Sequence, residues 1–176
     1  ALAVAAEIVA DVRVRGEAAL REQAERFDQV TGHAVRVPQS HIDDAIAGLA
    51  PDVRAALEEA IRRVRSASAA QVPPPQVTEL ATGARVTQRW QPVGRVGVYV
   101  PGGKAVYPSS VVMNVVPAQV AGVGSVALAS PPQRDHDGRV HPTILAAAGL
   151  LGVNEVYAMG GAGAIGALAH GVTTLD

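Results

Sequence analysis

Hydrophobic positions in the first part of the chain recur at the spacing of amphipathic helices. Ile8, Val12 and Val14 begin one apolar stripe, Gly16 interrupts it, and residues 18–27 resume it. A recurrence every three to four residues places these side chains on one helical face, and glycine weakens a helix at the point where it stands. The chain therefore begins with two predicted helices.

Two further helices are expected in the rest of the amino-terminal region. A short apolar piece covers residues 34–37, and Ser40 is the predicted N-cap of a helix that runs to Leu49. Pro51 stands at the first turn of the next helix, where its missing N–H costs nothing. These patterns predict an amino-terminal helical region over residues 1–72.

Three consecutive prolines, residues 73–75, mark the clearest boundary in the chain. They cannot continue a helix and favour an extended backbone. Residues 78–80 and 84–90 then resemble the two strands of a hairpin around Thr82 and Gly83. We expect a linker and hairpin over residues 73–92.

After the hairpin, apolar runs alternate with helical segments separated by Gly and Pro turns. The expected strands cover residues 96–100, 125–129 and 155–159, and the expected helices cover residues 109–121, 142–151 and 162–170. Continuous apolar strands between helices predict a parallel sheet that is buried on both faces. We expect an α/β fold in which residues 93–176 form an incomplete Rossmann-like domain, because the sequence stops directly after a strand–helix unit.

Composition narrows the classes of function. The formal net charge is −1 without a basic run, which argues against a nucleic-acid partner. No apolar stretch reaches the length of a membrane span, and the absence of cysteine excludes a disulfide scaffold or a thiolate zinc site. The histidines lack metal-binding spacing, so we expect no metal site within this chain. A cytoplasmic enzyme fits best.

Gly161, Gly163 and Gly166 match the G-x-G-x-x-G pattern after a predicted strand and at the start of a helix. Such glycines let backbone N–H groups approach a pyrophosphate at the positive end of a helix. The alternative is close packing between helix and strand, which needs small residues anyway. The motif also lies on the third strand–helix unit and not on the first, where it is expected.

A second candidate is the stretch Val96-Gly-Val-Tyr-Val-Pro-Gly-Gly-Lys104. Its strand delivers Tyr99 and a Pro-Gly-Gly turn to the carboxyl edge of the sheet, where open α/β folds bind ligands. Tyr99 contacts a cofactor there or is an ordinary core tyrosine. Ser109 and Ser110 begin the next helix, where a hydroxyl receives an anionic ligand or caps the helix.

The block RWQPVGRVGVYVPGGKAVYPSSVVMNVVPAQVAGVGSVALASPP closely resembles the histidinol dehydrogenases, as do HPTILAAAGLLGVNEVYAMGGAGAIGALAHGV and RGEAALREQAERFD. The resemblance covers essentially all of the chain in order. It implies the amino-terminal part of a longer homodimeric protein with an aldehyde-dehydrogenase-like fold.

The resemblance also implies an activity. Members of the family oxidise L-histidinol through L-histidinal to L-histidine, with NAD⁺ as the electron acceptor and a zinc ion that orients the substrate. Their zinc ligands and catalytic Glu-His pair lie beyond the Gly-Gly-Ala segment and have no counterpart here. We therefore expect no catalytic or metal-binding residue in this chain, which should be inactive alone.

A few site residues follow from the resemblance. Tyr99 matches the tyrosine that contacts NAD, and we add Pro101, Gly161 and Gly163 as cofactor contacts. Ser109 falls near a serine that lines the substrate pocket. The family often has glutamine where this chain has Gly163, so a side-chain amide contact is missing, and the literal G-x-G-x-x-G motif is a by-product of that replacement.

Two alternatives belong to other classes of protein. The chain is a catalytically dead α/β module for oligomerisation or ligand sensing, or a generic nucleotide-binding domain that uses the loop around Gly161. Zinc and Glu-His motifs after Asp176 would favour the dehydrogenase over the catalytically dead module. Titration with NAD⁺ and AMP tests the generic nucleotide-binding domain.

Overall fold

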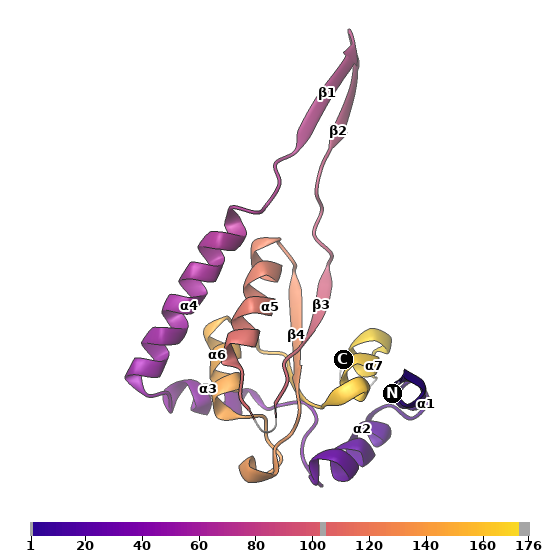
Figure 1. Ribbon diagram of the computed structural model, residues 1–176, viewed down its shortest axis with the longest axis vertical. Coiled ribbons are helices and arrows are strands. Elements are labelled where there is room, and N and C mark those ends of the chain that lie inside the picture. Colours follow the sequence, from indigo (N-terminus) through magenta and orange to yellow (C-terminus); the bar gives the residue numbers. More distant parts are fainter. Residues whose placement is uncertain (1, 103–104, 173–176) are drawn as a thin grey trace.

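The computed structural model describes residues 2–102 and 105–172, and its amino-terminal region is helical as predicted (Figure 1). This region comprises α1 (Leu2–Arg15), α2 (Glu17–Gln23), the π-helical turn η1 (Ala24–Asp28), α3 (Gln39–Ala47) and α4 (Pro51–Ala69). Gly16 separates α1 from α2 with a φ of +57°, which glycine adopts without strain. Pro51 opens α4 as predicted. The prediction for Ser40 is wrong, because extended Pro38 is the N-cap and Ser40 lies inside the first turn of α3.

The carboxyl-terminal half is a three-stranded parallel sheet covered by helices, as predicted. Its elements are β3 (Arg95–Tyr99), α5 (Pro108–Val120), β4 (Ser125–Ser130), the short 3₁₀ turn η2 (Arg134–His136), α6 (Pro142–Leu150), β5 (Val156–Ala158) and α7 (Gly161–His170). The strand order is β3-β4-β5. The predicted fold class, a parallel sheet with flanking helices after a helical region, is confirmed.

Each face of the sheet has its own core, because side chains alternate along the central strand β4. Leu128 points into the core shared with α5 and α6, which includes Val115 and Ile144. Ala127 and Ala129 point to the opposite face, where they pack with residues of α1, α2 and α7. The amino-terminal helices complete both layers, since α1 contacts α7, α3 contacts α6 and α4 contacts α5. The predicted boundaries at residues 72 and 92 stay predictions.

The two edges of the sheet differ. Residues 35–37 lie antiparallel to β5, where the N–H of Val37 donates to the carbonyl of Val156 and the N–H of Ala158 donates to the carbonyl of Val35. Within the described residues, β3 is the other edge strand. Its side chains are exposed or half-buried, so the expectation that every strand is buried on both faces is wrong for β3.

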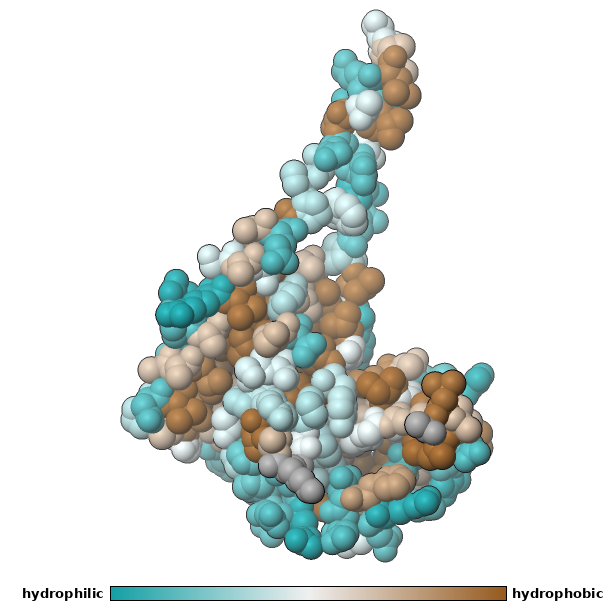
Figure 2. Space-filling model, in the orientation of Figure 1, coloured by the Kyte–Doolittle hydropathy of each residue, from teal (hydrophilic) through white to brown (hydrophobic). Residues whose placement is uncertain are grey.

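The predicted hairpin is a long arm that extends away from the body in Figure 1. It consists of β1 (Gln76–Ala81) and β2 (Ala84–Gln88), paired antiparallel. All of its residues are exposed, including the apolar side chains of Val77, Leu80 and Val86, and Figure 2 shows hydrophobic residues along the arm. Among the described residues, no helix is long and apolar enough to cross a membrane.

Candidate functional site

The predicted site residues meet at the carboxyl edge of the sheet. Since β3, β4 and β5 are parallel, the turns that follow them lie at one edge. Tyr99 pairs with Ala129 in the register of β3 and β4 and packs on the α7 side of the sheet. Pro101 is exposed in the turn after β3, and Gly161 is exposed at the start of α7. Gly103, the last residue of the Pro-Gly-Gly turn, lies outside the described residues.

A hydrogen bond joins two of these predicted residues. The backbone N–H of Gly161 donates to the hydroxyl of Tyr99 over 3.3 Å. Gly161 is the first residue of α7, where N–H groups have no intrahelical acceptor and the helix dipole is positive. Tyr99 is half-buried against the same helix. This edge therefore presents a phenol and the positive end of a helix side by side, an arrangement that suits an anionic or strongly polar ligand.

Glycine is favoured at the three positions of the G-x-G-x-x-G motif for different physical reasons. Gly161 has a φ of +57° and nothing near its Cβ position, so a turn conformation requires glycine there. Gly163 is buried against Gln23, and a Cβ atom built on Gly166 would lie 3.3 Å from the Cα of Val9. The latter two glycines thus let α7 approach α2 and α1 closely. This is the packing alternative, and a cofactor contact by Gly163 stays a prediction.

Ser109 lies at the same edge but in the other layer. It is exposed in the first turn of α5, which covers the face opposite α7. The N-cap of α5 is Tyr107, whose side chain makes no capping hydrogen bond. Ser109 therefore does not cap its helix. Its role toward a substrate stays a prediction.

The structure adds polar groups at this edge that the sequence patterns did not single out. The hydroxyl of Ser130, at the end of β4, and the amide nitrogen of Gln133 are buried without a hydrogen-bond partner among the described residues. That nitrogen lies 3.0 Å from the Cβ position of Gly102. The position of Ser130 at the end of a predicted strand was the only available signal. Gln133 lies in a loop whose course no local pattern predicts.

A carboxylate from the amino-terminal region also reaches this edge. Asp28, the last residue of η1, places Oδ2 3.6 Å from the Cβ position of Gly160. Burial raises the pKa of Asp28, because a desolvated carboxylate favours its protonated form. Asp28 is far from Gly160 in sequence, so only the fold brings the two together.

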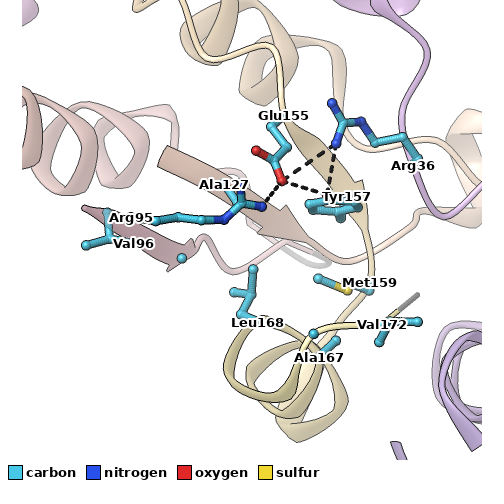
Figure 3. Close-up of a pocket in the computed structure, with 12 residues that line it drawn as sticks. Arg36, Arg95, Val96, Ala127, Glu155, Tyr157, Met159, Ala167, Leu168 and Val172 are labelled. Carbon is cyan, nitrogen blue, oxygen red and sulfur yellow. Dashed lines mark hydrogen bonds and ion pairs between the residues drawn. The ribbon is translucent and has the colours of Figure 1, made fainter. Parts of the chain in front are cut away.

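A separate cavity lies away from this edge. It has a volume of about 820 Å³ and is bordered by the starts of β3 and β5, at Arg95 and Glu155, and by the end of α7 (Figure 3). Neither this cavity nor four others in the described part of the chain are lined by Tyr99, Pro101 or Gly161. The carboxyl edge is nevertheless the candidate site, because ligands of open α/β sheets bind at that edge. The candidate site is thus an open edge and not an enclosed pocket.

A charged network lines one wall of the cavity. Glu155 pairs with Arg95 and lies 3.7 Å from Arg36, and the hydroxyl of Tyr157 donates to Glu155 over 2.7 Å (Figure 3). Burial raises the pKa of Tyr157, and the hydrogen bond to Glu155 raises it further. Arg36 also stacks on the Tyr157 ring at 5.1 Å. These bonds tie Arg36 to Tyr157 in β5, to Glu155 just before β5 and, through Glu155, to Arg95 at the start of β3, which indicates a structural role.

Comparison with known proteins identifies the family. A sequence profile described as Histidinol dehydrogenase matches residues 1–176. The chain belongs to the histidinol dehydrogenase family. It is 70% identical over 175 residues to the histidinol dehydrogenase of Leifsonia xyli subsp. xyli, covering 99% of this chain and 40% of that protein. With the histidinol dehydrogenase of Bifidobacterium longum the identity is 58% over 165 residues, which cover 93% of this chain and 35% of that protein.

A solved histidinol dehydrogenase has the same fold. The crystal structure of the enzyme from Elizabethkingia anophelis superposes with a TM-score of 0.92 at 29% identity, covering 99% of this chain and 40% of that chain. The chain thus spans about 40% of the length of this histidinol dehydrogenase. The fold implied by the sequence resemblance is confirmed.

The zinc ion implied by the histidinol dehydrogenase resemblance does not fit the described residues. Residues 2–102 and 105–172 contain no group of three or more His, Asp or Glu side chains arranged to hold a metal ion. His136 and His141 stack edge to face, with ring centroids 4.6 Å apart, and burial lowers the pKa of His141. No step of the chemistry is therefore assigned to a metal held by these residues alone.

Proposed function

We propose that the natural protein containing this chain is an NAD-dependent L-histidinol dehydrogenase that forms L-histidine by way of L-histidinal. The family match over residues 1–176 supports this proposal, as does the relative named "Histidinol dehydrogenase" at 70% identity. The observation that carries it is the contact between the Tyr99 hydroxyl and the N–H of Gly161. This contact joins two predicted cofactor residues at the edge where α/β folds bind nucleotides.

The role of this chain in the proposed reaction is to bind and orient the coenzyme. NAD⁺ supplies the hydride acceptor when it is bound. Tyr99 and the first turn of α7 offer a phenol and positive N–H groups to the coenzyme, and Pro101 borders the same edge. The amide nitrogens of Gln23 and Gln133, which have no hydrogen-bond partner among the described residues, provide further donors, so the residues present fit a polar dinucleotide.

The remaining parts of the proposal rest on the family resemblance. We propose that zinc ligands and the acid–base pair come from outside this chain, that Ser109 borders the substrate, and that the protein is a cytoplasmic homodimer. The chain alone should then bind coenzyme weakly and catalyse nothing, because one side of an open edge leaves the reacting groups in water.

Product formation tests the proposal directly. The complete natural protein, mixed with L-histidinol, NAD⁺ and zinc, should form NADH and L-histidine, whereas the 176-residue chain should form neither. The same assay with ethanol or L-histidine as the substrate serves as the control. Absence of NADH formation by the folded, zinc-loaded complete protein would contradict the proposed function.

A further inference from the structure

Gln23 and Gly163 occupy complementary positions where α2 meets α7. Gln23 is the last residue of α2, and Gly163 is the third residue of α7. A Cβ atom built on Gly163 would lie 1.9 Å from Oε1 and 3.0 Å from Cδ of Gln23. Both atoms belong to the carboxamide group. The Gln23 amide therefore fills the space that a side chain at position 163 would take.

This carboxamide is an unpaired polar group. Its Nε2 atom is buried and has no hydrogen-bond partner among the described residues. Buried polar groups in folded proteins are almost always paired, and each exception calls for a reason such as a ligand that the group receives. A half-turn about the last torsion exchanges the nitrogen and the oxygen of an amide, so the group can offer a donor or an acceptor.

The surroundings of the amide are those of the coenzyme edge. Gly163 lies in the same first helical turn as Gly161, whose N–H bonds to Tyr99. Directly after Gln23 the chain forms the π-helical turn η1, which ends at Asp28 beside Gly160. Such π turns are rare and frequent at functional sites. The segment from Gln23 to Asp28 thus brings two polar groups to the first turn of α7.

We propose that Gln23 is a coenzyme-binding residue, whose carboxamide reaches from α2 into the place that a side chain of residue 163 would otherwise fill. The inference rests on the proposed function, because it takes NAD⁺ as the ligand of this edge. Residues 23 and 163 then act as an exchangeable pair. The space at the first turn of α7 holds one side-chain amide, from position 23 or from position 163, but not both.

Three variants of the complete natural protein test the pair: Gln23→Ala, Gly163→Gln and the double variant. The measurements are the Kd for NAD⁺ by calorimetry, the KM for NAD⁺ and kcat, and the Tm without coenzyme. Gln23→Ala should raise the Kd and KM roughly tenfold with little change in kcat. Gln39→Ala removes the same side chain from the exposed start of α3 and should leave both constants unchanged.

Comparison of Gly163→Gln with the double variant gives the more specific test. Gly163→Gln alone should lower the Tm and weaken binding, because its side chain collides with Gln23. Adding Gln23→Ala to this variant should raise the Tm and restore most of the NAD⁺ affinity, so that the second substitution repairs the first. A merely structural role for Gln23 would restore the Tm without restoring the Kd.

The outcomes separate the two proposals. If the folded wild-type protein does not bind NAD⁺, the proposed function fails. If the wild type binds NAD⁺ while Gln23→Ala keeps the same Kd, the assignment of Gln23 is overturned and the proposed function stands. A double variant that binds NAD⁺ no better than Gly163→Gln also overturns the assignment.

Discussion

The hydroxyl of Tyr99 accepts a hydrogen bond from the backbone N–H of Gly161, 62 residues further along the chain. Tyr99 ends β3 and Gly161 begins α7, so the bond fixes the start of a helix to the end of a strand in the layer below. It also provides an acceptor for one of the N–H groups that are left without an intrahelical partner in the first turn of a helix. The phenol ring and the helix start are therefore held in one arrangement before any ligand arrives.

Substitution of Tyr99 should act on the coenzyme more than on the chemical step. In the complete natural protein, Tyr99→Ala should raise the KM for NAD⁺ roughly tenfold or more with a smaller change in kcat, because binding area and the hydroxyl are both lost. Tyr99→Phe keeps the ring and should raise the KM less, by about fivefold or under, as expected for a hydrogen bond worth about 1 kcal/mol. Steady-state kinetics at saturating L-histidinol measure both constants. An unchanged KM in the Ala variant would remove Tyr99 from the site.

The close approach of α7 to β3 predicts a stability effect at Gly97. A Cβ atom at this position would lie 2.9 Å from the Leu168 side chain. Gly97→Ala should therefore lower the free energy of unfolding by about 1 to 3 kcal/mol, as expected where an added methyl group overpacks a close contact between helix and strand. Gly94→Ala is the matched control, since nothing lies within 4 Å of its Cβ position. Urea denaturation measures the free energy of unfolding of both variants. Equal values would contradict the prediction and show that α7 moves away from β3 without cost.

The network around Glu155 should contribute to stability. The Glu155 side chain is only 18% exposed and pairs with Arg95 and Arg36. Glu155→Gln keeps the shape but removes the charge, and it should lower the free energy of unfolding by about 1 to 2 kcal/mol, between exposed and buried pairs. Glu59→Gln, which removes an exposed partner of Arg62 and Arg63, should cost less. A smaller loss at position 155 than at position 59 would contradict the structural role.

His33 predicts how stability changes with pH. His33 is 8% exposed, and its Nε2 lies 3.1 Å from the carbonyl of Ala158. Burial lowers the pKa of His33 from its ordinary 6.5, so the unfolded chain binds a proton that the folded chain refuses. Stability is then complete above the unfolded pKa and is lost as the pH falls below it.

The variant His33→Gln isolates this contribution. Glutamine keeps a donor for the Ala158 carbonyl but does not titrate, so the wild type should lose stability relative to the variant between about pH 7.5 and pH 5.5. Denaturant midpoints over this range provide the measurement. Parallel curves for the two proteins would mean that His33 does not titrate on unfolding.

Local patterns predicted most of the fold because Gly and Pro mark its element ends. The strand expected at residues 96–100 is Arg95–Tyr99, and the helix expected at residues 162–170 is Gly161–His170. Alternation and apolar runs report on neighbours in the sequence, which is enough to place helices and parallel strands. The exposure of β3 escaped prediction, because an apolar run does not reveal that its strand lies at an edge.

The features that sequence patterns missed all depend on distant contacts. Residues 35–37 pair with β5, and Arg36 bonds to Tyr157 across 121 positions. The overlap of Gln23 with Gly163 likewise joins residues far apart. Among the candidate site residues, Tyr99 and Gly161 were identified and do meet, while Gln23 and Asp28 lie in a helical segment whose polar residues resemble any solvated helix face.

The location of α7 determines at which edge of the sheet a further strand could be added. α5 and α6 cross one face, whereas α7 leaves β5 over the opposite face and packs Leu168 against Gly97 of β3. Parallel crossovers are right-handed, so a helix on this second face carries the chain back past β4, and residues 35–37 already occupy the far side of β5. In a longer polypeptide, any strand arriving by this route would align beside β3. The order in which strands are added to the sheet would then reverse direction next to Tyr99. In a doubly wound sheet, the crevice at such a point binds the nucleotide.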